Sequence, residues 1–281
     1  MTQNQIKKYY NECYGDYNRV WHAKKNLAFH YGFHNAHHRG FDEALIHMNS
    51  VLADRAKIKS ADTVLDAGCG IGGSSIWLAK NIGCQVIGVD INDKLLQIAR
   101  RLAKEKSVDR LVSFYTRDFC NTGLPANSLD VVWTLESMCH AEDKKVFLTE
   151  ARRILKPGGT LVIADGFLNQ PLDDKMRGYL DGWAVPNLIS DSLFYKWLLE
   201  LHFRNINFTD ITKNIMPSSN RLYVAGLAMY PIGKILEWIG VRTRVQTRNI
   251  EAAIFQHKAL RQGLCKYGIF VAQRGIERND L

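Results

Sequence analysis

A glycine-rich turn between an apolar run and a helical pattern limits the fold of this chain more than any other segment. The run Val64-Leu65-Asp66 ends on an acidic residue, and glycines follow at positions 68, 70, 72 and 73. Because glycine has no Cβ and tolerates positive φ angles, such a turn lets a ligand approach the backbone. The helix that begins near Ser74 would present its N-terminal amides and the positive end of its dipole to that ligand. The turn therefore predicts an α/β domain that holds a nucleotide-like cofactor.

Apolar and β-branched runs alternate with helical patterns from Thr63 onward. Strands alternating with helices are typical of a parallel sheet covered on both faces. Lys156-Pro157-Gly158-Gly159 is a stop-and-turn signal between a helix and the fifth strand. The predicted strands are 63–67, 85–90, 111–116, 129–134, 160–164, 205–210 and 266–272, and the predicted helices between them end near 81 or cover 94–106 and 144–155.

Three regions interrupt this alternation. Residues 1–60 are rich in Tyr, His and Asn and show helical patterns at 6–14 and 41–56. A crossing of the length between the sixth and seventh strands is not a simple loop in a compact domain. We therefore predict an N-terminal helical lid segment over 1–60 and a core over 61–281, with helical cap insertions at about 167–200 and 213–262.

Composition and charge exclude several classes of protein. The six cysteines show no C-x-x-C spacing, which argues against a zinc ribbon and against a disulfide scaffold. No apolar stretch approaches the ~20 residues that span a bilayer, and Met1–Lys8 lacks the apolar region of a secretory signal. A reduced, cytoplasmic location is the simplest expectation. The net charge of +9 is dispersed except for Arg242, Arg244 and Arg248, which could meet a phosphate or carboxylate.

Acidic residues near the glycine turn discriminate between cofactors. Gly68-x-Gly70-x-x-Gly73 formally fits the dinucleotide fingerprint. Asp90, at the end of the next strand, suits the ribose hydroxyls of nicotinamide and adenosyl cofactors alike. Asp66, where the chain enters the turn, would oppose a pyrophosphate but suits a cofactor that carries an ammonium group. After the third strand, Asp118 can accept a hydrogen bond from an adenine amine while Phe119 covers the ring.

This set of residues resembles the class I S-adenosylmethionine-dependent methyltransferases. The matching motifs are Asp66-x-Gly68-x-Gly70-x-Gly72, Asp90, Arg117-Asp118-Phe119 and Leu155-Lys-Pro-Gly-Gly159. The resemblance implies a Rossmann-like α/β fold: a seven-stranded, mostly parallel sheet with an antiparallel last strand, helices on both faces and a helical cap. It also implies S-adenosyl-L-methionine as the cofactor, held by Asp66, Gly68, Cys69, Gly70, Gly72, Asp90, Ile91, Asp118, Phe119 and Glu136.

Looser matches point to one group within this class. The segment Trp133-Thr-Leu-Glu136-Ser-Met-Cys-His140 is similar to the segment after strand four of sterol and tocopherol C-methyltransferases. Tyr9-Tyr10, His30-Tyr-Gly-Phe-His34 and Trp183-Ala-Val-Pro186 are similar to other parts of these enzymes. Large apolar side chains outside the sheet, among them Trp183 and Pro186, favour a hydrophobic small-molecule acceptor, such as an isoprenoid, an aromatic ring or a natural-product scaffold. The segment with Glu136 and His140 favours methylation at carbon. O- or N-methylation of a small natural product is the alternative.

Methyl transfer needs positioning and, for some acceptors, a base. Orientation alone supplies on the order of 7–11 kcal/mol in well-positioned systems. Glu136 and His140 follow strand four, at the sheet edge where open α/β folds bind ligands. If that segment is helical, their i,i+4 spacing puts both on one face. Glu136 is then a candidate for stabilising positive charge or accepting a proton, and His140 for orienting it or acting as the base.

The N-terminal aromatic and histidine residues invite two interpretations. His34, His37 and His38 are close in sequence, but no cysteine or paired carboxylate completes a tetrahedral metal site, so we expect no metal. We expect instead a lid over cofactor and acceptor that excludes water, with Tyr10, Tyr31, His34 and Trp183 as its ligand-facing residues.

Two other classes of protein fit the sequence less well. A nucleic-acid methyltransferase would fit the basic charge, but the chain has Leu135-Glu-Ser-Met where a target motif such as Asn/Asp-Pro-Pro-Tyr is expected. A binding-only paralogue is disfavoured by the intact Asp66, Gly68, Gly70 and Asp90. We therefore expect no nucleic-acid partner and no membrane span, and the sequence leaves a homodimer open.

Overall fold

The computed structural model describes residues 1–171 and 173–276, which form two compact units. The sheet unit comprises Met48–Asp165, Asp191–Thr209 and the residues from Gly268 onward. The helical unit comprises Met1–His47, Gly166–Ser190 and Asp210–Tyr267.

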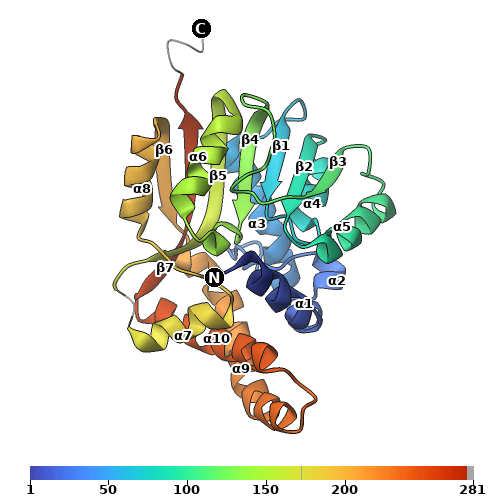
Figure 1. Ribbon diagram of the computed structural model, residues 1–281, viewed down its shortest axis with the longest axis vertical. Coiled ribbons are helices and arrows are strands. Elements are labelled where there is room, and N and C mark those ends of the chain that lie inside the picture. Colours follow the sequence, from blue (N-terminus) through green and yellow to red (C-terminus); the bar gives the residue numbers. More distant parts are fainter. Residues whose placement is uncertain (172, 277–281) are drawn as a thin grey trace. The chain divides into compact units, whose positions relative to one another are not determined.

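Within the described residues, seven strands form one sheet in the order β3-β2-β1-β4-β5-β7-β6 (Figure 1). Each strand from β3 to β5 in this order is parallel to its neighbours. Between β1 and β2, for example, Leu65 lies opposite Ile87. The interiors of these strands are almost continuously apolar, as expected for strands that are buried on both faces. The strand bounds are Thr63–Ala67 (β1), Gln85–Asp90 (β2), Val112–Thr116 (β3), Leu129–Leu135 (β4), Leu155–Leu168 (β5), Phe203–Asp210 (β6) and Cys265–Arg274 (β7).

Hydrogen bonds at both ends of β7 show that it runs antiparallel to its neighbours. At its last residue, the Arg274 guanidinium donates to the carbonyl of Leu155, the first residue of β5. At its other end, the amide of Asn169, just after β5, donates to the carbonyl of Leu264 at 3.0 Å. The amide of Ile211, just after β6, likewise donates to the carbonyl of Tyr267 at 2.9 Å. The Rossmann-like sheet with an antiparallel last strand is therefore confirmed.

Amphipathic helices accompany the sheet. In α5, Leu95, Leu96, Ala99 and Ala103 are buried while basic residues face outward. On α8, the Phe194 ring packs 4.9 Å from the ring of Phe270 in β7, so this helix, from the predicted 167–200 insertion, belongs to the sheet unit. The helices of this unit are α4 (Gly73–Asn81), α5 (Asp93–Glu105), α6 (Lys144–Ile154), α8 (Asp191–Glu200) and the end of α3 (Phe41–Ala56).

The predicted bounds agree with the structure to within a few residues, except at β5. Lys156–Gly159 was expected to end a helix and turn, but β5 already begins at Leu155. Leu129 pairs with Leu155 and Val131 pairs with Thr160, so the four residues form a bulge inside the strand. Gly158 has a φ of +77° within this bulge. The Pro-Gly-Gly run thus does bend the backbone locally, but β5 remains paired with β4 on both sides of the bend.

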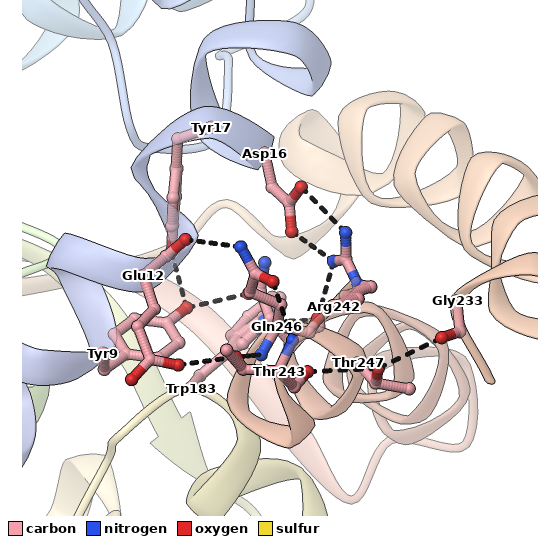
Figure 2. A network of polar contacts seen from close by, with 11 residues as sticks. Tyr9, Glu12, Asp16, Tyr17, Trp183, Gly233, Arg242, Thr243, Gln246 and Thr247 are labelled. Atoms are coloured by element: carbon pink, nitrogen blue, oxygen red, sulfur yellow. Dashed lines mark hydrogen bonds and ion pairs between the residues drawn. The ribbon is translucent and has the colours of Figure 1, made fainter. Parts of the chain in front are cut away.

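The helical unit is held together by polar contacts between α1 (Gln3–Val20) and α10 (Arg244–Arg261). Arg242, just before α10, forms an ion pair with Asp16, and the hydroxyl of Thr243 donates to Glu12 at 2.5 Å (Figure 2). The Tyr9 hydroxyl donates to Asn249 at 2.8 Å. The other helices of this unit are α2 (Ala23–Asn26), α7 (Asp174–Gly182) and α9 (Thr212–Trp238). Among the described residues, no helix is long and apolar enough to cross a membrane.

Candidate active site

The glycine turn after β1 is crowded where the sequence requires glycine. Gly68, Gly70 and Gly72 have φ angles of +79°, +54° and +79°, which L-residues with a side chain rarely adopt. A Cβ on Gly68 would lie 2.4 Å from the Cβ of Ser137 and 3.7 Å from the Phe119 ring. The turn therefore lies against Ser137, just after β4, and Phe119, beyond β3, so the ends of three strands meet around it.

Gly68→Ala is expected to lower stability by about 3 kcal/mol, because it combines a positive φ with a steric clash. Gly158→Ala is the matched control, since Gly158 has a similar φ of +77° but a Cβ added there would meet nothing within 4 Å. Thermal unfolding should show that the melting temperature falls clearly further in Gly68→Ala than in Gly158→Ala. Equal falls in melting temperature would mean that the close contact with Ser137 does not contribute to the loss of stability.

Three amides of the glycine turn, those of Gly68, Cys69 and Gly70, donate to acceptors within the protein. The Gly68 and Cys69 amides both donate to the Val89 carbonyl, at 2.8 and 3.0 Å. The Gly70 amide donates to Asp90 Oδ2 at 2.9 Å, and the Asn92 amide donates to Asp90 Oδ1 at 2.8 Å. These three turn amides are therefore already used within the protein and do not point to a pyrophosphate. Asp90 thus holds both the glycine turn and the segment that follows β2.

Asp66 occupies the N-terminus of α4. Its Oδ2 accepts a hydrogen bond from the Ser75 hydroxyl at 2.6 Å, and the side chain is buried. Burial raises the pKa of the Asp66 carboxyl to about 6 and the charge of Asp90 adds to the rise, whereas hydrogen bonds from Ser75 oppose it. At this helix end, where the sequence predicts contact with a ligand, a protein carboxylate thus already engages Ser75. Such a carboxylate repels an anion and attracts an ammonium group.

The predicted adenine-binding residues lie close to the same turn. One carboxylate oxygen of Asp118 accepts from the Cys120 amide at 2.8 Å, which fixes the side chain. The Phe119 ring packs edge-on against Phe147 of α6, with ring centres 5.4 Å apart. Ile91 directly follows β2, beside Asp90. All ten residues predicted to hold the cofactor therefore belong to the sheet unit.

The segment that carries the candidate catalytic residues is not α-helical. Glu136 has a left-handed φ of +53°, and its amide donates to the Ala164 carbonyl at 2.9 Å. A short 3-10 helix, η1 (Met138–His140), follows it. The condition for the i,i+4 argument is therefore not met, because Glu136 precedes the helix. Both residues do lie after β4, at the sheet edge where the glycine turn lies.

A buried lysine that the sequence did not single out holds this segment. The Lys144 ammonium donates to the carbonyls of Ala141 at 2.7 Å and Cys139 at 3.1 Å, and its side chain is buried. Burial lowers its pKa, while the neighbouring Cys139 and Asp165 oppose that shift. Asp165, also buried, accepts from the Cys139 amide at 2.9 Å. A lysine at the start of an amphipathic helix reads as solvent-exposed, so only the tertiary structure shows this role.

Lys144→Met should destabilise the protein by about 1–3 kcal/mol, because it leaves buried carbonyl groups without a donor. Lys145→Met is the control, since Lys145 is half-exposed and its ion pair with Glu200 lies at the surface. Unfolding in urea, followed by fluorescence, compares the two variants. Equal stability of the two variants would show that the hydrogen bonds from Lys144 to the Ala141 and Cys139 carbonyls do not stabilise the fold.

The four predicted lid residues all fall in the helical unit, although they are distant in sequence. The Tyr31 hydroxyl donates to Gln256, and the ring is buried against Trp21 and Tyr267. The other three also contact their own unit: Tyr10 packs edge-on on Tyr9, the His34 ring lies 2.9 Å from the Ser218 hydroxyl, and the Trp183 indole donates to the Asn249 carbonyl.

The N-terminal histidines and the arginine cluster have partners within the protein. His38 stacks on His47 with ring centres 3.7 Å apart. Across residues 1–171 and 173–276, no group of three or more His, Cys, Asp or Glu side chains could hold a metal ion. Arg242 is paired with Asp16, and Arg248 lies 3.4 Å from Asp181. Two of the three clustered arginines are thus engaged with carboxylates of the helical unit.

Comparison with known proteins agrees with this geometry. The profile of a methyltransferase domain matches residues 65–163. The chain is 33% identical over 228 residues to the 2-methyl-6-phytyl-1,4-hydroquinone methyltransferase of Synechocystis sp., covering 75% of this chain and 68% of that protein. It is 31% identical over 169 residues to the sterol 24-C-methyltransferase of Kluyveromyces lactis, covering 57% of this chain but only 46% of that protein. The chain thus spans about half the length of the sterol relative.

Solved structures share the fold along nearly the whole chain. The [4+2]-cyclase SpnF superposes with a TM-score of 0.80 at 20% identity, over 98% of this chain and 97% of that one. The geranyl diphosphate C-methyltransferase of Streptomyces coelicolor, solved with S-adenosyl-L-homocysteine, gives a TM-score of 0.75 at 20% identity, over 97% of both chains. The fold and the site define a class I methyltransferase domain. The chain belongs to the S-adenosylmethionine-dependent methyltransferase family, in the group that includes the sterol and tocopherol methyltransferases.

Proposed function

We propose that this protein transfers a methyl group from S-adenosyl-L-methionine to a carbon atom of a hydrophobic small molecule. The observation that carries the proposal is the meeting of Asp66, Asp90, Phe119 and the glycine turn around the ends of strands β1 to β4. This donor set fits the cofactor: a buried carboxylate for an ammonium group, a second one for ribose hydroxyls, and an aromatic ring for adenine. S-adenosyl-L-methionine, when bound, supplies the methyl group.

The protein's own residues then bind, orient and handle charge. Asp66 binds the ammonium end, Asp90 accepts from the ribose, and Asp118 with Phe119 binds the adenine. Glu136, after β4, stabilises positive charge on the acceptor or takes a proton from it, and His140 orients Glu136 or acts as the base. We propose that Tyr10, Tyr31, His34 and Trp183 belong to a lid that excludes water from the reaction.

The proposed acceptor class rests on the relatives. The names of the two relatives above refer to a phytyl-substituted hydroquinone and to a sterol, both hydrophobic. A neighbouring structure contains geranyl diphosphate, an isoprenoid. We therefore propose an isoprenoid, a prenylated aromatic ring or a similar natural-product scaffold as the acceptor. O- or N-methylation of a small natural product is the second candidate, because the same positioning serves those atoms.

The test is transfer of an isotope-labelled methyl group to a panel of acceptors. The panel contains a prenylated hydroquinone, a sterol with a side-chain double bond and geranyl diphosphate, with tRNA and duplex DNA as controls. We expect label in an organic-extractable product, and NMR of that product should place the methyl group on carbon. Label on oxygen or nitrogen would favour the second candidate, and label on nucleic acid would contradict the proposal.

A further inference from the structure

Helix α9 has two apolar sides, and one of them packs inside the helical unit. Leu222, Gly226 and Gly233 are buried on this side. A Cβ on Gly226 would lie 2.9 Å from Ile254, and one on Gly233 would lie 3.2 Å from Ile250, both on α10. The two helices thus pack closely through small residues, and they form a hairpin in Figure 1.

The opposite side of α9 is apolar as well, and it is exposed. An α-helix turns by about 100° per residue, so six of the exposed apolar residues of α9 fall along one side, across from Gly226 and Gly233. We call them the exposed stripe; they are Val224, Leu227, Ile232, Ile235, Trp238 and Ile239. Trp238 is 86% exposed and Ile235 is 60% exposed. Single exposed apolar residues are normal, but a continuous stripe marks an interaction surface.

The charge around the stripe favours an anionic partner. From Thr212 to Arg261, helices α9 and α10 and their connection contain eight Lys and Arg residues against two Glu residues. This segment therefore carries a surplus of six positive charges, of which four remain after Arg242 is paired with Asp16 and Arg248 with Asp181. Anionic lipid surfaces attract such segments. A second copy of this chain would bring the same positive charge and would be repelled.

The form of the helix favours a position on a membrane surface. No helix among the described residues is apolar enough to cross a membrane, and α9 contains Pro217 and Pro231. A helix that exposes an apolar side next to basic residues can lie in the plane of the interface instead. Tryptophan is enriched at that depth, and Trp238 lies at the end of α9.

We propose that the exposed stripe of α9 docks the protein on anionic lipid bilayers, with Trp238 and Ile235 inserted among the headgroups. Basic residues of the α9–α10 hairpin then contact the lipid phosphates. This inference does not depend on which acceptor is methylated.

Flotation with lipid vesicles tests the docking proposal. The full chain is mixed with vesicles of phosphatidylcholine and phosphatidylglycerol (3:1) or of phosphatidylcholine alone. We expect flotation with the anionic vesicles that weakens with added salt, and at least tenfold less binding of the double variant Ile235→Glu/Trp238→Glu. Val146→Glu is the matched control, since Val146 is 48% exposed on α6 in the sheet unit, and it should float like the wild type.

Binding of S-adenosyl-L-methionine and thermal unfolding confirm that each variant is folded. The proposal is overturned if the wild type does not float at low salt, or if the double variant floats equally well. It is also overturned if analytical ultracentrifugation shows a wild-type dimer that the double variant disrupts while neither protein floats.

Discussion

Asp66→Asn is expected to weaken binding of S-adenosyl-L-methionine at pH 7.5 by about 100-fold. The ionised carboxylate is buried at the start of α4, beside the glycine turn, so in the proposed role it would meet the cofactor's ammonium group with little solvent screening. Loss of one member of such a charge pair costs roughly 3 kcal/mol, which is about 100-fold in affinity. Isothermal titration calorimetry measures the effect, with Asp109→Asn, an exposed carboxylate, as the control.

The same variant should be more stable than the wild type without cofactor at neutral pH. The folded Asp66 carboxyl holds its proton up to a pH of about 6, whereas an unfolded Asp loses it near pH 4. The folded state therefore binds more protons between these values, and the free energy of unfolding falls as the pH rises through this window. Above pH 6, ionisation of the buried Asp66 lowers the free energy of unfolding by about 3 kcal/mol. Asparagine removes it while its side-chain oxygen can still accept from Ser75.

Opposite changes in stability and affinity separate a binding role from a purely structural one. If Asp66 only capped α4, Asp66→Asn would leave the affinity for S-adenosyl-L-methionine unchanged. That result would contradict the proposed role.

Glu136→Gln is expected to lower kcat by about 10²- to 10⁴-fold while leaving cofactor affinity within about threefold. The amide keeps the size of the side chain and tolerates the same backbone, but it carries no negative charge and cannot take a proton. Single-turnover transfer of labelled methyl measures the chemical step. Glu142→Gln, six residues further on, is the control for loss of one acidic charge. Normal turnover of Glu136→Gln would rule out both the base role and the charge-stabilising role.

Most of the fold was predictable because its signals are local. Apolar and β-branched runs located every strand of the sheet except β5 to within about two residues of its observed bounds. Lys156–Gly159 shows the limit of that reasoning. A Pro-Gly-Gly run has strong turn chemistry, yet pairing of Leu129 with Leu155 and of Val131 with Thr160 carries the sheet across it.

The site was predictable in residue type but not in contacts. The motifs identified Asp66, Asp90 and the glycines, but the use of the turn's amides and the capping of α4 by Asp66 depend on how β1, β2 and α4 meet in space. Lys144 was missed because its burial against the Cys139 and Ala141 carbonyls arises only in the tertiary structure. The left-handed φ of Glu136 likewise leaves no mark in the sequence, since glutamate rarely adopts it.

The helical unit was the least predictable part. Its helices come from three separated segments, and sequence periodicity cannot say which of them pack together. The ion pair between Arg242 and Asp16 joins residues 226 positions apart. An arginine that looked available to a substrate phosphate therefore holds α1 against the start of α10.

The central claim is that Asp66, at the glycine turn, binds the ammonium end of S-adenosyl-L-methionine. Calorimetric titration of the wild type with S-adenosyl-L-methionine and with 5′-methylthioadenosine, which lacks the amino acid end, tests it at pH 7.5 and pH 5. Because Asp66 has a pKa of about 6, we predict one site whose affinity for S-adenosyl-L-methionine falls about tenfold at pH 5. The affinity for methylthioadenosine should not change. Equal pH dependence for both ligands, or no binding of S-adenosyl-L-methionine, would contradict the claim.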